Sequence, residues 1–201
     1  MSGALTASGS QRVVGAARRV VKDAWWMLRG AALRTPVRAE PPRRVLFVCH
    51  GNICRSPYAA LLASALAADR GGSSIDWQSA GFAAAPGAAS PAEALAAGRR
   101  DGVSLDAHRA TRLDADMVQA FDLLVVFEVA HLTRLQREYP GAADRFVLLP
   151  LLSPRRAGAF GYARYNIADP FGQSAAVFDA CYARIRRDLA AYVDSLAIHH
   201  P

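Results

Sequence analysis

Residues 44–57 read RVLFVCHGNICRSP, and this stretch predicts a strand, a tight polar loop and the start of a helix. The apolar run at its beginning, which ends at Cys49, is typical of a strand buried on both faces of a sheet. A polar, glycine-containing turn follows. Ser56-Pro57 then begins a helical stretch that continues to about Ala68, with proline in the first turn, where its missing N–H is tolerated. The segment therefore predicts a strand–loop–helix unit.

The rest of the chain repeats the alternation of strand and helix. Further strands are expected at 75–80, 122–127 and 145–149, and helical patterns occupy 91–101, 114–120, 129–138 and 175–197. Alternation of this kind predicts a parallel sheet covered by helices on both faces. We therefore expect a single α/β domain of Rossmann-like type with a four-stranded parallel sheet.

The charge of the chain is distributed unevenly. Its 201 residues, 52% of them hydrophobic, suit one compact domain. The formal net charge is +7, and residues 1–44 hold nine basic and two acidic groups, so that residues 45–201 are balanced. A nucleic-acid-binding domain would carry its basic groups on the folded part. We therefore predict no nucleic-acid partner, an N-terminal extension with a proline-containing linker over 1–43, and a folded domain over 44–201.

Residues 12–33 predict a basic amphipathic helix, with apolar side chains every three or four residues and Arg18, Lys22 and Arg29 on another face. One interpretation is contact with an anionic membrane surface. The alternatives are a helix packed on its own domain, a partner-binding arm and a leader without stable structure. Because charges interrupt the apolar runs, we expect neither a secretory signal peptide nor a membrane span.

The cysteines indicate a reducing compartment. Cys49, Cys54 and Cys181 are too few for a disulfide framework, and their spacing is not that of a zinc site. We therefore expect a cytoplasmic protein. Residues 12–33 are the segment through which it would contact the inner face of the membrane. We predict no metal and no cofactor.

The loop from Cys49 to Ser56 suits the chemistry of an anion. A thiol above a helix N-terminus meets unpaired backbone N–H groups and the positive end of the helix dipole, which favour its thiolate. The same concave nest suits a tetrahedral dianion. Arg55 follows Cys49 after five intervening residues, so its guanidinium can return over the sulfur and bind two oxygens as a planar fork. The loop therefore predicts an anion site next to a reactive cysteine.

The string VCHGNICRSP at 48–57 resembles the signature of the low-molecular-weight protein tyrosine phosphatases, and the resemblance extends over nearly all of residues 43–197. It implies the phosphotyrosine phosphatase I fold and two-step hydrolysis of phosphotyrosine monoesters. By this resemblance Cys49 is the nucleophile that forms a phosphocysteine, Arg55 binds phosphate, and the Ser56 hydroxyl eases departure of the thiolate. The implied phosphate-binding residues are His50, Gly51, Asn52, Ile53, Cys54 and Arg55.

The resemblance also implies a general acid. The family uses an Asp-Pro aspartate, and Asp169-Pro170 lies in a loop before the last helix, about 120 residues after the cysteine. A phenolate leaving group needs a proton as the P–O bond breaks, and a positioned carboxylic acid contributes roughly 10²–10⁴-fold to such a step. Asp169 then becomes the base that activates water.

Three further residues are implied to support the loop. In the family, equivalents of Asn52, Ser79 and His108 form a hydrogen-bond network that holds the asparagine in a left-handed conformation, which Asn tolerates better than other non-glycine residues. Cys54 has two interpretations. It forms a reversible protective disulfide with Cys49, as the resemblance suggests, or it fills the loop as a small apolar side chain.

The chain departs from the family pattern at two places. Many relatives carry two aromatic residues after Asp-Pro, whereas here Phe171 is followed by Gly172. The second wall of the substrate slot is therefore expected to be open or to be supplied elsewhere, by Tyr165 or His50. Phe127-Glu128 replaces a common Met-Asp pair, and the sequence offers no function for it.

Alternative functions come from the same fold. The family resemblance suggests that threonine at the position of Ile53 favours phosphoarginine, whereas isoleucine favours a flat aromatic ring. Arsenate reductases need additional cysteines around the equivalent of 115–130, where this chain has none. A non-catalytic, membrane-docked phosphate-binding adaptor is the remaining alternative. The expected partners are phosphotyrosine-containing proteins, with a tyrosine kinase as one candidate.

Overall fold

The computed structural model describes residues 33, 40–71, 74–153 and 161–197. Apart from Leu33, the helix predicted over 12–33 lies outside the described residues, and so does most of the linker that follows it. Within the described residues, no helix combines the length and the apolar character needed to cross a bilayer.

The centre of the fold is a parallel sheet of four strands in the order β2-β1-β3-β4. Their bounds are β1 Arg44–Cys49, β2 Asp76–Gly81, β3 Leu123–Val126 and β4 Phe146–Leu148. In the register of the central strand, Val48 lies opposite Ala80 on one side and Val126 on the other. The apolar run 45–48 is completely buried, because helices cover both faces of the sheet.

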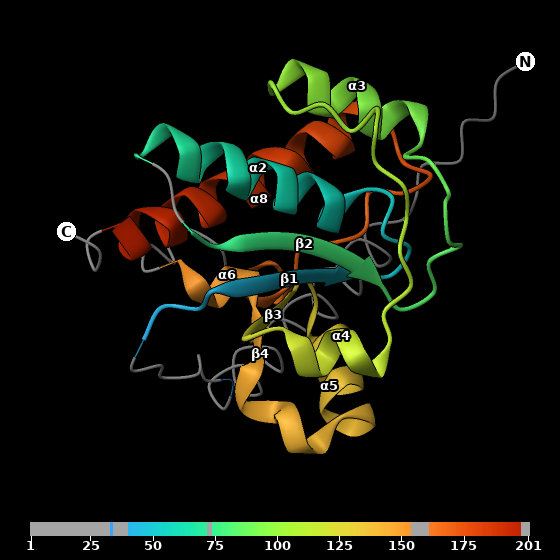
Figure 1. The fold of residues 1–201 in the computed structure, drawn as a ribbon. Coiled ribbons are helices and arrows are strands. Elements are labelled where there is room, and N and C mark those ends of the chain that lie inside the picture. Colours follow the sequence, from blue (N-terminus) through green and yellow to red (C-terminus); the bar gives the residue numbers. More distant parts are fainter. Residues whose placement is uncertain (1–32, 34–39, 72–73, 154–160, 198–201) are drawn as a thin grey trace, which may run out of the picture.

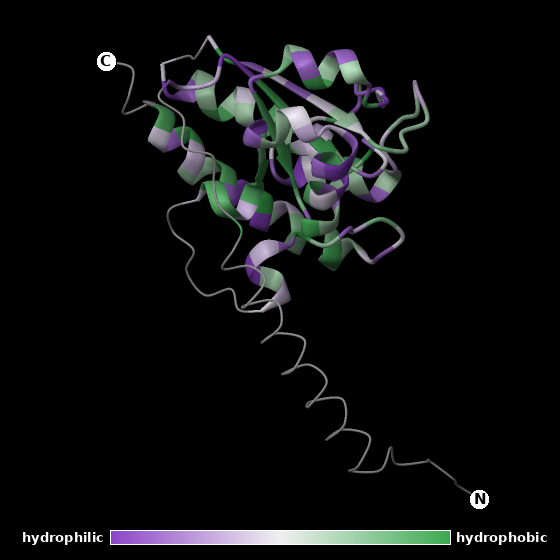
Figure 2. Ribbon diagram, turned by 90° about the horizontal axis from the view of Figure 1, so that it is seen from below, coloured by the Kyte–Doolittle hydropathy of each residue, from purple (hydrophilic) through white to green (hydrophobic). Residues whose placement is uncertain are grey.

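In the part of the chain that the structure describes, five α-helices of six residues or more cover the sheet (Figure 1). Their bounds are α2 Arg55–Asp69, α3 Ala92–Arg100, α4 Ala115–Ala120, α5 Val129–Glu138 and α8 Ala175–Ala197. The first and last of these lie side by side over one face, with α3 beside them, and α4 and α5 lie on the opposite face. Figure 2 shows hydrophobic strands between helices of mixed character, as expected for amphipathic helices around a core.

The predicted fold class is confirmed, and each strand and helix predicted over 44–197 corresponds to an element of the described structure. Three short elements were not predicted: η1 Pro140–Arg145, α6 Leu149–Leu152 and α7 Tyr162–Tyr165. The strand predicted to end at Leu149 ends at Leu148, because the run LPLL turns into α6 with proline in its first turn.

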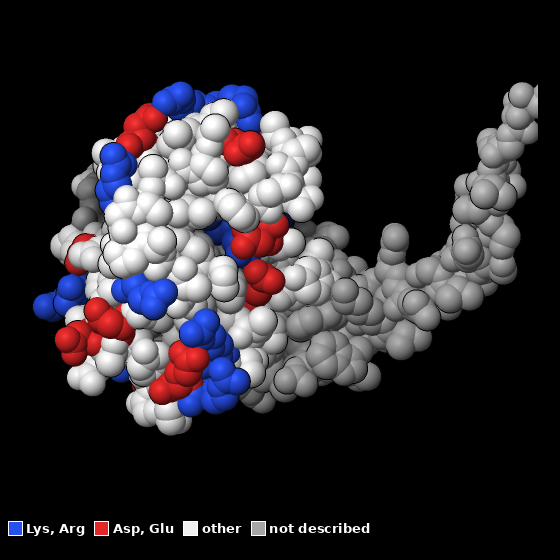
Figure 3. Space-filling model, turned by 90° about the vertical axis from the view of Figure 1, so that its right-hand side faces the viewer, with Lys and Arg blue, Asp and Glu red and all other residues white. Residues whose placement is uncertain are grey.

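The strand order places a crevice at a defined point of the sheet. The chain passes from β1 to β2 on one side and then to β3 on the other, so the loops after β1 and β3 diverge at the carboxyl ends of adjacent strands. In open α/β sheets, ligands bind at such a switch point. The predicted loop follows β1, and Glu128 lies just beyond the end of β3. Figure 3 views this end of the molecule, where basic and acidic side chains are interspersed.

Candidate active site

The loop after β1 wraps over the beginning of α2. The helix begins at Arg55 without a side-chain cap, and its first residues are buried. Within the described residues, Gly51, Ile53 and Cys54 donate no backbone hydrogen bond. Backbone N–H groups left unpaired at a helix N-terminus form a site for an anion. The local fold therefore produces the concave nest that the sequence predicts.

Cys49 lies at the floor of this loop and is 3% exposed. Its Sγ is 3.0 Å from the Ser56 hydroxyl oxygen and accepts a hydrogen bond from the backbone N–H of Asn52 at 3.3 Å. Both groups can donate to a thiolate. The structure thus brings the predicted nucleophile next to the hydroxyl that is expected to stabilise it when it leaves.

Asn52 holds the loop in shape. It has a φ of 54°, and within the described residues it is the one non-glycine residue with positive φ. Its Nδ2 donates to the hydroxyls of Ser56 and Ser79 at 2.8 and 2.9 Å. Its Oδ1 accepts from the Thr111 N–H at 2.7 Å, and its carbonyl oxygen lies 2.7 Å from His108 Nε2. Four partners on three segments therefore fix one left-handed residue.

The protonation state of His108 fits this network. A carbonyl oxygen can only accept, so Nε2 must carry the proton and donate to it. Burial lowers the pKa of His108 below its ordinary value, against the hydrogen bond to Asn52, which raises it. The ring is therefore neutral near pH 7 and adopts the Nε2–H tautomer.

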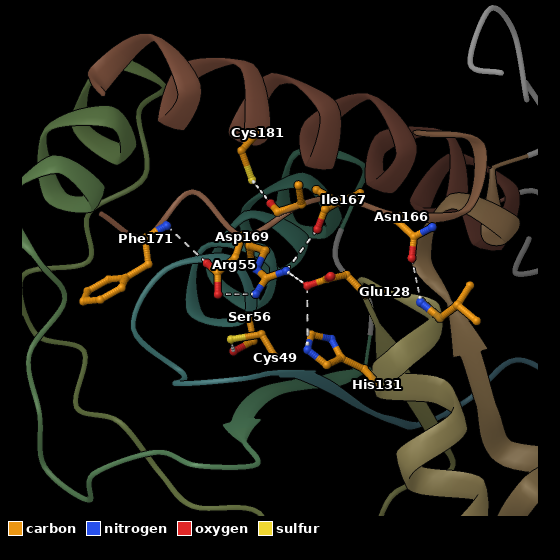
Figure 4. Close-up of polar contacts among 12 residues, drawn as sticks. Cys49, Arg55, Ser56, Glu128, His131, Asn166, Ile167, Asp169, Phe171 and Cys181 are labelled. Carbon is orange, nitrogen blue, oxygen red and sulfur yellow. Dashed lines mark hydrogen bonds and ion pairs between the residues drawn. The ribbon is translucent and has the colours of Figure 1, made fainter. Parts of the chain in front are cut away.

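The Arg55 guanidinium is 1% exposed and is held between Asp169 on one side and Glu128 with the Ile167 carbonyl oxygen on the other (Figure 4). Its Nη1 donates to the Glu128 carboxylate and to the Ile167 carbonyl oxygen, the latter at 3.0 Å. Its Nη2 pairs with Asp169 Oδ2 at 2.6 Å, whereas Nε is buried without a partner within the described residues. Burial by itself would lower the pKa of Arg55, but its electrostatic interactions with Cys49, Asp169 and Glu128 raise that pKa overall.

The segment that carries Asp169 is attached to the end of β3. The Ile167 N–H donates to the Phe127 carbonyl oxygen at 2.8 Å, and Asn166 Oδ1 accepts from the Val129 N–H at 2.8 Å. The Asp169 side chain is 41% exposed, and its Oδ1 accepts from the Phe171 N–H at 3.2 Å. The predicted acid is thus exposed to solvent while the chain before it is held firmly.

Of the residues predicted to form the walls of the substrate slot, Phe171 and His50 are exposed and Tyr165 is not. Phe171 is 59% exposed, and His50 is also exposed, so both can contact a ligand at the mouth. Tyr165 is 4% exposed and belongs to the hydrophobic core. Its assignment as a wall is therefore wrong, because packing of α7 turns the ring inward.

The cysteines are unpaired in the structure. Cys54 is 3% exposed, and burial raises the pKa of its thiol. Burial likewise raises the pKa of Cys181 to about 12, and its Sγ contacts the Ala168 carbonyl oxygen at 3.8 Å. Both thiols are protonated at neutral pH, and the Cys49–Cys54 disulfide stays a prediction.

Sequence reasoning missed two residues of the site, Glu128 and His131. The carboxylate of the first contacts Arg55, and its Oε1 lies 3.8 Å from His131 Nε2. Burial lowers the pKa of His131 to about 4, so this ring is neutral at pH 7. The signal available was the departure from Met-Asp at 127–128, directly after a strand that the topology places beside β1.

Comparison with known proteins agrees with this geometry. The family model described as "Low molecular weight phosphotyrosine protein phosphatase" matches residues 44–200. A probable low molecular weight protein-tyrosine-phosphatase from Erwinia amylovora, AmsI, is 32% identical over 155 residues, which cover 76% of this chain and 96% of that protein. A protein-arginine-phosphatase from Geobacillus stearothermophilus is also 32% identical, over 78% of this chain and 95% of that protein.

Among solved structures, the chain is similar to the tyrosine phosphatase Wzb from Escherichia coli K30 in complex with sulphate. The TM-score is 0.67 at 26% identity, and the match covers 78% of this chain and 99% of that one.

Proposed function

The chain belongs to the low molecular weight phosphotyrosine protein phosphatase family, and from this membership we propose that Cys49, Arg55, Ser56 and Asp169 carry the hydrolysis of phosphotyrosine monoesters. The observation that carries the proposal is the buried Nε of Arg55, which has no partner within the described residues although the guanidinium is 1% exposed. A buried N–H of a charged group is costly without an acceptor. Two phosphoryl oxygens bound by Nε and Nη2 would satisfy it.

In the first step the Cys49 thiolate attacks phosphorus. The S–P bond forms while the bond from phosphorus to the tyrosyl oxygen breaks, and Asp169 donates its proton to that oxygen. The free backbone N–H groups of the loop and the fork of Arg55 bind the three equatorial oxygens, whose charge is spread over them in the transition state. The products of this step are free tyrosine on the protein and a phosphocysteine.

In the second step water attacks the phosphocysteine. Asp169, now a carboxylate, accepts a proton from the water, the new P–O bond forms, and the S–P bond breaks with its electron pair on sulfur. The Ser56 hydroxyl lies between two acceptors, Cys49 Sγ at 3.0 Å and the Ala80 carbonyl oxygen at 3.2 Å. Its single proton turns to the sulfur as the thiolate departs, which lowers the barrier of this step.

The proposal is tested with single substitutions. Cys49→Ser should abolish turnover of p-nitrophenyl phosphate and of a phosphotyrosine peptide. Asp169→Ala should lose roughly 10²–10⁴-fold in kcat on the peptide, whose phenolate leaves poorly, and less on p-nitrophenyl phosphate. Equal losses on both substrates would count against Asp169 as the acid, and turnover by Cys49→Ser would refute the covalent mechanism.

Phosphoarginine is the second candidate substrate, because a protein-arginine-phosphatase is as similar to this chain as the tyrosine phosphatases are. Ile53, part of the loop, favours the aromatic substrate by the resemblance given above. A panel of phosphotyrosine, phosphoserine and phosphoarginine peptides without added metal decides between them. A kcat/KM for phosphoarginine above that for phosphotyrosine would overturn the assignment.

We also propose phosphotyrosine-containing proteins, a tyrosine kinase among them, as substrates, and a cytoplasmic location at an anionic membrane surface. The support for the location is the basic amphipathic pattern of 12–33, which lies outside the described residues except for Leu33. The full chain should sediment with vesicles that contain anionic lipid, and a chain without residues 1–40 should not. Equal sedimentation of the two would refute this role.

A further inference from the structure

We infer that Glu128 is a positioning residue for Arg55, and that Glu128 and Asp169, which share its guanidinium, act in opposite directions on phosphate binding. This inference rests on the proposed function of Arg55 as the phosphate-binding residue. Glu128 stays bound to the guanidinium with and without substrate. Asp169 binds Nη2 in the free protein, and a phosphoryl oxygen replaces it there when substrate binds.

The distribution of contacts over the guanidinium separates the two carboxylates. Nη1 is bound by Glu128 and by the Ile167 carbonyl oxygen at 3.0 Å. Nη2 is bound by Asp169 at 2.6 Å, and Nε is unpartnered within the described residues (Figure 4). A planar guanidinium binds a tetrahedral anion through two N–H groups on one edge. Nη1 is occupied by Glu128 and Ile167, so the edge available to phosphate is the one formed by Nε and Nη2. Phosphate therefore competes with Asp169 and not with Glu128.

The two carboxylates also differ in how firmly they are held. Glu128 is the N-cap residue of α5 at the end of a buried strand, and its side chain is 20% exposed. Its second oxygen, Oε2, accepts a hydrogen bond from the Tyr162 hydroxyl at 3.3 Å. Asp169 lies in a loop, is 41% exposed and has a further contact with the Phe171 N–H. Displacing Asp169 therefore costs less than displacing Glu128, which keeps the plane of the guanidinium fixed.

This arrangement couples substrate binding to acid catalysis. When two phosphoryl oxygens bind Nε and Nη2, the ion pair of Asp169 with Nη2 breaks. The carboxyl group of Asp169 is then free to face the leaving oxygen beside the phosphate. Glu128 and Ile167 hold Nη1 throughout, so Arg55 does not follow the departing carboxylate.

The experiment measures the inhibition constant Ki of inorganic phosphate for single variants of the full chain. Asp169→Asn should lower Ki about three- to tenfold, since it removes the competitor. Glu128→Gln should raise Ki about tenfold, since its amide holds Nη1 without charge. If the carboxylates acted only by repelling the anion, both substitutions would lower Ki, so an unchanged or lower Ki for Glu128→Gln overturns the inference.

The controls separate positioning from folding and from the proposed function. Glu138→Gln removes an exposed carboxylate that pairs with Arg134 on the same helix, about 15 Å from Glu128 along the helix axis, and should leave Ki unchanged. Glu128→Asp keeps the charge with a shorter reach, so its Ki should lie between those of the native chain and Glu128→Gln. A Ki for Glu128→Asp above that of Glu128→Gln would refute a role for the charge. Where Glu128→Gln fails to fold, a Ki for Glu128→Asp no higher than that of the native chain overturns the inference. If these Ki values contradict the inference while Cys49→Ser still abolishes turnover, the proposed function stands and only the role of Glu128 is refuted.

Discussion

Gly81, at the end of β2, is a position where an added methyl group should disturb the geometry of the Cys49 loop and lower activity without preventing the chain from folding. A Cβ added there would lie 2.7 Å from the Asn52 backbone nitrogen, 2.8 Å from the His50 carbonyl oxygen and 2.9 Å from Asn52 Cβ. All three belong to the loop between Cys49 and Ser56, and two of them are backbone atoms that no rotamer change can move. Gly81→Ala must therefore shift either the loop or the strand.

The size of the effect follows from these distances. Ordinary van der Waals contact needs about 3.4 Å, so the loop or the strand must move by about 0.7 Å. A displacement of about 1 Å at a reacting group costs on the order of 10²-fold in rate, so we expect kcat/KM to fall roughly 10- to 100-fold. Overpacking in a close-packed site costs about 1–3 kcal/mol of unfolding free energy.

The assay compares Gly81→Ala with a matched substitution away from the loop. A Cβ at Gly98 in α3 would lie 2.6 Å from the Val103 carbonyl oxygen and 2.4 Å from Leu105 Cδ1, so Gly98→Ala is overpacked as severely. Urea unfolding should show a similar loss for both variants, and p-nitrophenyl phosphate turnover below the unfolding range should fall only in Gly81→Ala. Turnover of Gly81→Ala within twofold of the native chain would refute the claim that the loop position is set by β2.

Three further predictions concern the groups around the loop. His131 has a pKa of about 4, lowered by burial from about 6.5 in the unfolded chain. The unfolding free energy that depends on the neutral ring is therefore fully present above pH 6.5 and is lost as the pH falls toward 4. His131→Gln should remove on the order of 3 kcal/mol of that pH dependence in urea titrations, and an unchanged slope would contradict the buried neutral ring. Asn52→Ala should lower kcat at least tenfold with the far-ultraviolet circular dichroism spectrum retained, because a left-handed residue loses its three side-chain hydrogen bonds. Cys54→Ser should make inactivation by hydrogen peroxide irreversible with dithiothreitol, whereas equal recovery in both chains would count against the Cys49–Cys54 disulfide.

The fold could be read from the sequence because its patterns are long and consistent. The continuous apolar run at 45–48 is completely buried, and the helix predicted over 175–197 corresponds to α8 at both ends. The short elements could not be read in this way. The four residues of α6 are apolar and follow a strand directly, so periodicity cannot separate them from a longer strand.

The site was predictable only where its chemistry is local in sequence. Cys49, Arg55 and Ser56 lie within eight residues of each other, and the resemblance added Asp169. Tyr165 was misassigned because the sequence near the Asp-Pro turn does not show whether an aromatic ring faces solvent or the core. In the structure this ring is buried. Burial of this kind depends on tertiary packing that no local pattern encodes.

The partners of Arg55 show why a short motif is not sufficient to define this site. Arg55 belongs to the motif, but its partners at Nη1 and Nη2 lie after β3 and before α8, at least 70 residues further along the chain. Asn52 likewise depends on β2 and on residues 108–111. The loop therefore supplies Cys49, Arg55 and Ser56, and segments at the ends of β2 and β3 and before α8 supply the contacts that orient it. Because those strand ends meet only at the switch point, the parallel order β2-β1-β3 is itself a condition for bringing Glu128 to the guanidinium that follows the Cys49 loop.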